Sequence, residues 1–333
     1  MSLLKGRMPK TYYEVKKFLK HQKEMDALYQ EQLALNKGKQ VQYWNWWPDE
    51  RTAYWLERFM LSRGLLDKTN KTIALCSVFG EREVLERVEA EVKIFFSGEN
   101  LHNPCYSQYA DYMLSSATPF DFAMGFDEFE NEKYLRFPLW LIYLFPPNAT
   151  EMDIRKQCEE INHPTNTTRS RFCSLIARAD TSGLRTHIYN RLSSFGKIDC
   201  PSVLFHNDDT LKEQYNDDKL KYLTNCLFNI CPENSNASGY CTEKIFESLT
   251  AGCIPIYWGC NNMPEQKILN QDAIIFWDTE TDGEKAILQI KELYANQKHL
   301  YSFMQQPRLS SNAEEEILRM MDELYNRLRI MLE

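Results

Sequence analysis

Residues 231–259 read CPENSNASGYCTEKIFESLTAGCIPIYWG, and this stretch predicts a strand–loop–helix–strand unit. A short apolar run at 227–230 leads into it as a buried strand, and a polar loop follows at 233–240. Thr242 is placed to cap a helix that Gly252 can end in a left-handed turn. The run around Pro255 predicts a second strand in an irregular or edge position. Such units build open α/β sheets, which bind anionic ligands where strands end and helices begin.

The same stretch resembles the signature of glycosyltransferase family 10, the α1,3/4-fucosyltransferases, in their soluble bacterial type. That family has a Glu-Asn-Ser segment, then Gly-Tyr-x-Thr-Glu-Lys, then Ile-Pro-Ile-Tyr-x-Gly. Here these segments lie at 233–235, 239–244 and 254–259. The resemblance extends, with gaps, over 43–278. It implies an α/β protein of the GT-B fold, in which two Rossmann-like domains face each other across a cleft.

The length of 333 residues also favours two domains, because single cores rarely grow beyond about 250–300 residues. Alternating apolar runs and helical segments predict parallel sheets. We expect strands at 41–47, 72–79, 92–96, 171–178 and 273–276, and helices at 81–90, 184–195, 209–221, 283–296 and from 312 onward. The expected organisation is a basic helical extension at 1–40, an acceptor-binding domain at 41–150, a linker within 148–169, a GDP-sugar-binding domain at 170–310, and an amphipathic helix at 311–333 that crosses back to the first domain.

Glu99 is the candidate general base. It follows the third expected strand in the segment Ser97-Gly98-Glu99-Asn100, and a carboxylate just after a strand end is well placed to enter a cleft. The family has a similar Thr-Gly-Glu-Asn segment, followed by a turn like the one at 125–129. The resemblance implies that Glu99 removes the proton of the acceptor hydroxyl. The alternative is an ordinary solvated loop glutamate.

The donor-binding candidates cluster in the second expected domain. Arg185 begins a helix beside a strand end, where a guanidinium can meet a diphosphate with two hydrogen bonds. Lys244 and the helix starting near Thr242 add positive charge. The resemblance implies that Arg185 and Lys244 bind the diphosphate, that Glu243 contacts the donor sugar or ribose, and that Asn234 and Tyr240 complete the donor site.

No Asp-x-Asp motif occurs in the chain, so the usual metal-carrying aspartate pair is missing. We therefore expect no metal ligands and no cofactor other than the donor substrate, GDP-fucose. Cationic side chains would instead neutralise the leaving diphosphate.

Acceptor binding has weaker candidates. Asn45, Trp46 and Trp47 end the first expected strand, and the two indoles either pack in the core or stack on a sugar face. The tyrosine-containing segment 101–118 is either an acceptor loop or a lid with its own small core. Residues 200–202, Cys-Pro-Ser, replace a Gly pair that the family usually has, which leaves the course of this loop beside the nucleotide open.

The resemblance implies an inverting transfer of fucose from GDP-β-L-fucose to O3 or O4 of N-acetylglucosamine or glucose in a glycan. Two alternatives stay open: a GT-B transferase of another nucleotide sugar, and a non-catalytic glycan- or nucleotide-binding protein. The acceptor glycan and the oligomeric state are not specified.

The first 40 residues are rich in lysine and carry a partial apolar stripe. They either contact an anionic membrane weakly or pack on the first domain. The net charge of −8 argues against a broad nucleic-acid surface, and the ten cysteines lack zinc-ligand spacing. No apolar run is long enough to span a bilayer. We expect a cytoplasmic protein that can touch the inner face of the membrane.

Overall fold

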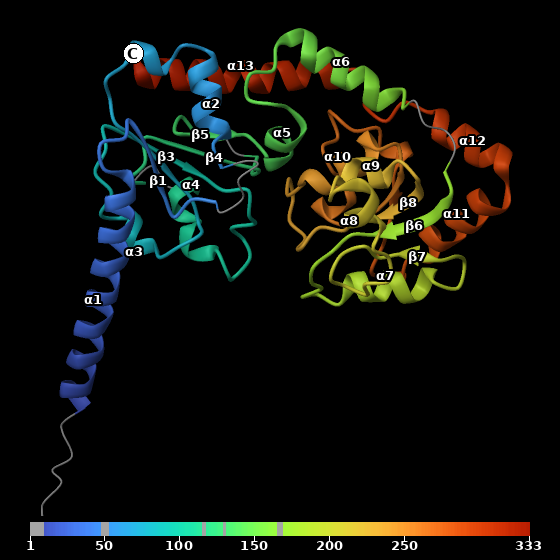
Figure 1. The fold of residues 1–333 in the computed structure, drawn as a ribbon, viewed down its shortest axis with the longest axis horizontal. Coiled ribbons are helices and arrows are strands. Elements are labelled where there is room, and N and C mark those ends of the chain that lie inside the picture. The colour runs from blue at the N-terminus through green and yellow to red at the C-terminus, as the bar shows by residue number, and fades with distance from the viewer. Residues whose placement is uncertain (1–9, 48–52, 115–117, 129–130, 165–168) are drawn as a thin grey trace, which may run out of the picture.

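The computed structural model describes residues 10–47, 53–114, 118–128, 131–164 and 169–333. It contains two separate five-stranded sheets, and every strand pair within them is parallel. We call the sheet β1–β5 with its helices the first lobe, and the sheet β6–β10 with its helices the second lobe (Figure 1). The prediction of two Rossmann-like units in a GT-B arrangement is confirmed.

The first sheet is built in simple sequential order, β1-β2-β3-β4-β5. Its strands are short and almost continuously apolar, as expected of parallel strands covered on both faces. Their side chains form buried clusters on the two sides of the sheet. The strands are β1 (Val41–Trp44), β2 (Ile73–Cys76), β3 (Val92–Phe96), β4 (Phe122–Gly125) and β5 (Tyr134–Arg136).

The second sheet has the order β10-β9-β8-β6-β7, so the chain changes direction between β6 and β8. This reversal leaves a crevice at the carboxyl ends of the two strands, because the connections from β6 and β8 depart to opposite sides. The strands are β6 (Arg171–Leu175), β7 (Ile198–Asp199), β8 (Cys226–Ile230), β9 (Ile254–Tyr257) and β10 (Ile275–Phe276).

Helices cover both sheets and connect the lobes (Figure 1). Their bounds are α1 (Lys10–Asn36), α2 (Trp55–Ser62), α3 (Arg82–Leu85), α4 (Asp111–Leu114), α5 (Leu139–Leu144), α6 (Glu151–Asn162), α7 (Leu184–Leu192), α8 (Thr210–Tyr215), α9 (Lys219–Leu223), α10 (Glu243–Thr250), α11 (Glu284–Ala295), α12 (Gln297–Gln305) and α13 (Ala313–Leu332).

The position expected for Pro255 is wrong. Strand β9 lies inside the sheet, between β8 and β10. Proline is tolerated there because the pairing of β9 with β10 begins only at Ile256. On the other side, Ile256 O accepts a hydrogen bond from the backbone of Cys231, so the alternation of a parallel strand turns the proline nitrogen toward the end of the short β10.

Two other segments differ from expectation. The helix expected at 209–221 is two helices, α8 and α9, because Asn216 and Asp217 between them adopt left-handed backbone conformations. The helix expected at 81–90 is limited to the four residues of α3.

The region expected as a linker contains helix α6, which begins with a capping box between Thr150 and Asp153. It buries Ile154, Cys158 and Ile161. Because α6 packs against α13 and α10, the segment between the lobes is a packed element. Helix α6 lies between the expected end of the first domain at 150 and the expected start of the second domain at 170. These domain limits remain a proposal.

Helix α13 connects the second lobe to the first. It begins beside the second lobe and runs across α6 and β5 (Figure 1). One apolar face is buried, and Lys71 of the first lobe donates a hydrogen bond to Met331 O near the end of the helix, at 3.0 Å. At the domain interface, Trp140 of α5 stacks on Phe246 of α10 with ring centroids 4.2 Å apart. The two lobes therefore pack against each other through buried side chains.

Candidate functional site

A pocket of about 580 Å³ opens at the switch point of the second sheet. Strands β6 and β8 end together there, with Leu175 opposite Ile230. The segments that follow both strands line the pocket together with the start of α10, which is where open parallel sheets bind nucleotides. Among the lining residues are four of the predicted donor residues and two others: Arg185, Asn234, Glu243, Lys244, Lys219 and Ser202.

Arg185 and Asn234 lie side by side at one wall of this pocket. Arg185 Nη2 donates to Asn234 Oδ1 at 2.8 Å, and Nη1 donates to Ala179 O at 2.7 Å. The arginine belongs to the first turn of α7, and its backbone N–H donates to Asp180. The guanidinium is therefore held by neutral acceptors, and its positive charge is available to an anion in the pocket.

Lys244 is held by Glu233, a carboxylate for which the sequence suggested no role. Glu233 Oε2 lies 3.0 Å from Lys244 Nζ, and its side chain is fully buried. Glu233 also accepts hydrogen bonds from the backbone N–H and the hydroxyl of Thr242, at 2.8 and 2.7 Å. One feature of the sequence could have marked this residue: it follows a buried strand by three positions and faces the start of a helix, where unpaired N–H groups need an acceptor.

Thr242 does not cap α10 with its own side chain, contrary to expectation. Its hydroxyl instead donates to Glu233 and accepts from Lys244 Nζ at 2.8 Å. Gly259 makes room for this cluster, because a Cβ atom there would lie 2.6 Å from Glu233 Cγ. The glycine of the Ile-Pro-Ile-Tyr-x-Gly segment is thus required by the buried carboxylate.

The charges in this cluster hold each other ionised. Burial by itself would lower the pKa of Lys244, but the carboxylates of Glu233 and Glu243 outweigh it and raise that pKa above its usual value. Burial would likewise raise the pKa of Glu243, but the charges of Lys244 and Lys219 lower it. Lys219 forms an ion pair with Glu247 on the next turn of α10. The pocket therefore keeps a cation and an anion side by side at the start of α10.

Tyr240 lies outside this pocket, at the contact between the lobes. It is buried, and its ring meets Phe126 of the first lobe edge-on, with centroids 5.0 Å apart. Next to it, Gly239 has a φ of +75°, and a Cβ atom there would lie 2.7 Å from Phe126 O. The Gly-Tyr pair thus allows the central loop to approach the first lobe closely. A donor contact for Tyr240 stays a prediction.

Glu99 follows β3 on the first lobe and faces this contact. Its backbone N–H donates to Ser97 Oγ, and the next residue, Asn100, donates from Nδ2 to Ser235 Oγ on the second lobe at 2.9 Å. Burial raises the pKa of Glu99, the charge of Lys244 opposes this rise, and Glu243 and Glu233 add to it. The structure therefore brings Glu99 within electrostatic reach of the donor-pocket charges, with a raised proton affinity that suits a general base.

Asn45, Trp46 and Trp47 lie away from the donor pocket. The Asn45 side chain accepts from Gln32 of α1 and donates to Glu81 O, so it ties α1 to the end of β1. Trp47 stacks on Phe96 at 5.3 Å, and Trp46 donates from Nε1 to Ala53 O. Both indoles are half-buried. The described contacts are packing contacts, and acceptor binding by these three residues stays a prediction.

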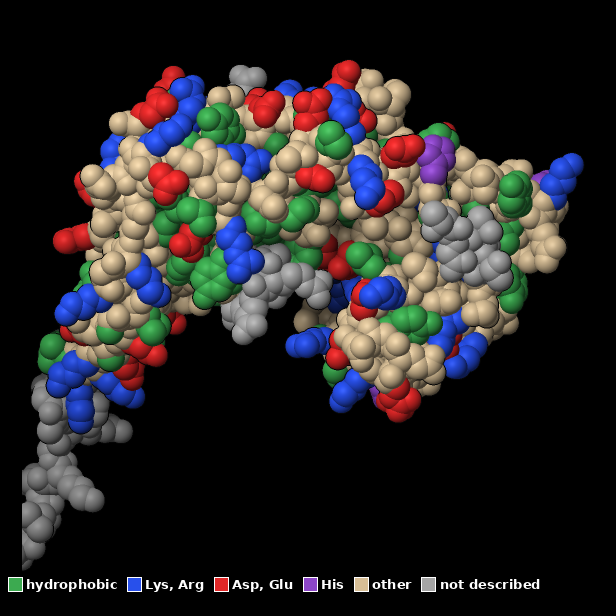
Figure 2. Space-filling view, turned by 45° about the horizontal axis from the view of Figure 1, so that its top comes forward, with side chains coloured by type: hydrophobic (Ala, Val, Ile, Leu, Met, Phe, Trp, Pro, Cys, Tyr) green, Lys and Arg blue, Asp and Glu red, His purple; other side chains and the backbone are tan. Residues whose placement is uncertain are grey.

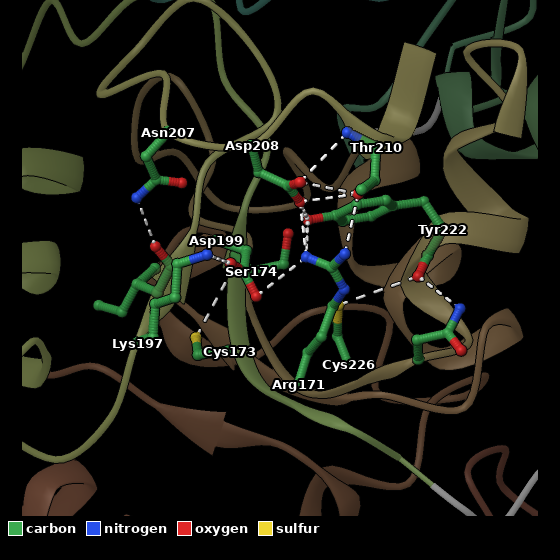
Figure 3. Close-up of polar contacts among 12 residues, drawn as sticks. Arg171, Cys173, Ser174, Lys197, Asp199, Asn207, Asp208, Thr210, Tyr222 and Cys226 are labelled. Atoms are coloured by element: carbon green, nitrogen blue, oxygen red, sulfur yellow. Dashed lines mark hydrogen bonds and ion pairs between the residues drawn. The ribbon is translucent and has the colours of Figure 1, made fainter. Parts of the chain in front are cut away.

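The loop at 200–202 is anchored by a cluster of polar side chains around Arg171 and Asp199 (Figure 3). Arg171 pairs with Asp199 at 3.1 Å and with Asp208 at 2.6 Å, and Tyr222 donates to Asp208. Asn207 accepts from the backbone N–H of Cys200 and donates to Ile198 O. Hydrogen bonds with Asn207 thus hold the loop that replaces the family's Gly pair, and this loop contributes Ser202 to the pocket wall.

Within the described residues, no group of three or more His, Cys, Asp or Glu side chains is arranged to hold a metal ion. In the same part of the chain, no helix is long and apolar enough to cross a membrane.

The two parallel sheets, with the switch-point pocket on one lobe and Glu99 on the other, define the chain as a protein of the GT-B fold. Two family models match it: the alpha-(1,3)-fucosyltransferase FucT N-terminal domain over residues 41–143, and the glycosyltransferase family 10 (fucosyltransferase) C-terminal model over 165–318. Together they cover most of the chain, and the chain belongs to glycosyltransferase family 10, the fucosyltransferases.

Individual relatives agree with this assignment. The chain is 26% identical to the alpha-(1,3)-fucosyltransferase FucT of Helicobacter pylori over 76% of its own length, and 30% identical to alpha-(1,3)-fucosyltransferase B of Drosophila melanogaster over 31%. It spans 56% of the first relative and 22% of the second.

Solved structures share the fold. A crystal structure of an alpha1,3-fucosyltransferase is similar with a TM-score of 0.57 and 20% identity, over 86% of this chain and 89% of that one. A second, with GDP-fucose, has a TM-score of 0.53 and 19% identity, over 85% and 89%.

Proposed function

We propose that this protein transfers L-fucose from GDP-β-L-fucose, with inversion, to O3 or O4 of N-acetylglucosamine or glucose in a glycan. The observation that carries the proposal is the switch-point pocket, where Arg185 and Lys244 supply two cations beside the start of α10. These groups suit a diphosphate, and family membership favours GDP-fucose as its bearer.

Glu99 takes the proton from the acceptor hydroxyl. The acceptor oxygen attacks C1 of fucose while the bond from C1 to the GDP oxygen breaks, and the β-linked donor becomes an α-fucoside. Arg185, Lys244 and the helix start neutralise the charge that develops on the departing GDP. Asn234 orients Arg185, and Glu243 contacts the ribose or the donor sugar.

A panel of nucleotide sugars tests this function. GDP-fucose is expected to be hydrolysed slowly alone and to transfer fucose to N-acetyllactosamine or lactose, whereas UDP- and ADP-sugars stay intact. Turnover of another nucleotide sugar, or binding without turnover, would favour the two alternatives.

Activity is expected to persist in excess EDTA, because cationic side chains neutralise the leaving diphosphate in place of an aspartate-bound metal. Complete loss in EDTA with recovery in manganese would contradict the assigned role of Arg185 and Lys244.

We also propose that α1 makes weak contact with an anionic membrane at the cytoplasmic face. The second half of α1 packs on the first lobe, with Met25 buried and Asp26 paired to Arg87 at 2.6 Å. The preceding half projects from the molecule and carries basic and hydrophobic side chains (Figures 1 and 2). Val15, Phe18 and Leu19 are each more than half exposed, with Lys16, Lys17 and Lys20 among them.

Sedimentation with vesicles tests this contact. The full chain is expected to sediment with phosphatidylserine-containing vesicles at low salt and to be released by salt, since each lysine near the surface contributes about 1 kcal/mol. The Phe18→Ser/Leu19→Ser variant should bind less, whereas Ile330→Ser, which removes an even more exposed apolar side chain on α13, should not differ from wild type. Equal sedimentation of all three proteins would refute the proposal.

A further inference from the structure

The segment that follows Glu99 contains three tyrosines, and the structure separates their surroundings. Tyr109 and Tyr112 are buried, and both pack against Phe95 of β3. Tyr106 is only half-buried. Tyr109 and Tyr112 therefore form the small core of this segment. Of the three tyrosines, Tyr106 is the one that a ligand can reach.

Two consecutive hydrogen-bonded turns connect Tyr106 to the residue after Glu99: the backbone N–H of Asn103 donates to Asn100 O at 3.0 Å, and that of Tyr106 donates to Asn103 O at 2.9 Å. Burial and the negative charge of Glu99 both raise the pKa of the Tyr106 phenol. A half-exposed aromatic ring near a general base is placed to contact the molecule that the base deprotonates. Sugar rings carry an apolar C–H face, which packs on aromatic side chains.

His102 is held in a defined orientation in the same segment. Its Nε2 lies 2.6 Å from Asp127 Oδ1, and its ring meets Phe126 edge-on at 6.0 Å. The side chain of Asp127 is 13% exposed, whereas that of His102 is 49% exposed. The carboxylate thus anchors the imidazole from the protein side and leaves the ring accessible. With Nε2–H donated to Asp127, Nδ1 can accept a hydrogen bond from a hydroxyl group.

The backbone of this segment is connected to the second lobe. The backbone N–H of His102 donates to Asn100 Oδ1, and Asn100 Nδ2 donates to Ser235 on the central loop. Phe126, which contacts the imidazole, also contacts Tyr240 of that loop. His102 is therefore fixed relative to Glu99, three residues earlier, and relative to the donor lobe.

We propose that His102 and Tyr106 form the subsite for the acceptor sugar. Tyr106 packs on the apolar face of the sugar ring, and His102, oriented by Asp127, accepts a hydrogen bond from a hydroxyl next to the one that Glu99 deprotonates. This inference rests on the proposed function. It assigns the acceptor contacts to His102 and Tyr106 of the first lobe.

Steady-state kinetics with N-acetyllactosamine and lactose test the subsite. His102→Ala and Tyr106→Ala are each expected to lower kcat/KM for the acceptor about 3- to 10-fold, chiefly through a higher acceptor KM, while the KM for GDP-fucose changes less than twofold. Tyr106→Phe, which keeps the ring, should restore most of the acceptor affinity, and His102→Gln, which keeps an acceptor atom, should restore part of it.

Matched controls exist on the second lobe. His206 has the same 49% exposure as His102 and pairs with Asp209 at 2.9 Å, and Tyr301 is also exposed. His206→Ala and Tyr301→Ala should leave both KM values unchanged. Equal acceptor kinetics in wild type, His102→Ala and Tyr106→Ala would overturn the subsite, as would losses in donor and acceptor KM of equal size. A wild-type protein that neither hydrolyses GDP-fucose nor transfers fucose would contradict the proposed function itself.

Discussion

Glu99→Gln is expected to slow fucosyl transfer by about 10²–10⁴-fold, the usual size of a general-base contribution, while the affinity for GDP stays nearly unchanged. The amide keeps the size of the carboxylate but cannot take the acceptor proton. GDP affinity should not follow the rate, because Glu99 belongs to the first lobe and does not line the switch-point pocket. Transfer assays and calorimetry with GDP on the purified variant measure both quantities.

The pH dependence of the same variant gives a second expected result. Because burial raises the pKa of Glu99, the wild-type rate should begin to fall, as pH is lowered, above the pH at which an exposed glutamate titrates. This acidic limb should be absent from the residual activity of Glu99→Gln. Near-wild-type transfer would remove Glu99 from the mechanism, and loss of GDP binding by a folded variant would move it to the donor site.

The raised pKa also predicts a change in stability. A carboxyl that binds its proton more tightly in the folded state contributes stability below its unfolded pKa and loses that contribution as pH rises through its folded pKa. Glutamine does not titrate, so Glu99→Gln should gain thermal stability over wild type near pH 7.5 and lose this advantage toward pH 4. Melting curves at the two pH values check the sign.

Lys244→Met is expected to destabilise the protein by about 3–5 kcal/mol, because it leaves the fully buried carboxylate of Glu233 without its cation. It should also weaken GDP binding by about 1.5–3 kcal/mol through the loss of a charge-assisted hydrogen bond. The double variant Glu233→Gln/Lys244→Met removes both charges. It should regain much of the lost stability without regaining GDP affinity.

Arg185→Ala provides the contrast to Lys244→Met. Arg185 is held by carbonyl and amide oxygens and leaves no buried charge behind when it is removed. The Arg185→Ala variant should therefore bind GDP more weakly, by an amount similar to that of Lys244→Met, with little change in the free energy of unfolding. Chemical denaturation and calorimetry on the four proteins separate the two effects. Equal stability of Lys244→Met and wild type would show that Glu233 does not depend on Lys244.

The strand–loop–helix–strand unit was predicted correctly at 227–259 because its elements depend on local signals. These are a buried apolar run, a helix of high amphipathicity and Gly252 at a left-handed helix end. Pro255 led to a wrong prediction. A strand at 273–276 was expected, but the sequence does not show which strands pair, so only the tertiary structure places β9 between β8 and β10. The break between α8 and α9 was likewise missed, because Asn216 and Asp217 adopt left-handed conformations that their sequence allows but does not require.

By itself, the sequence determined the family and the two parallel sheets, because long ordered motifs and alternating apolar runs are local signals. Of the five donor-binding residues that the resemblance implied, Arg185, Asn234, Glu243 and Lys244 line one pocket, whereas Tyr240 lies outside it. Only the tertiary structure decided which charges compensate each other. Glu233 precedes Lys244 by 11 residues and is buried against it, a pairing that the sequence does not reveal, and Asn100 reaches Ser235 across the two lobes. The tertiary structure also separated Tyr106 from Tyr109 and Tyr112. The sequence alone does not distinguish these three tyrosines, because the burial of each depends on how the segment packs against β3.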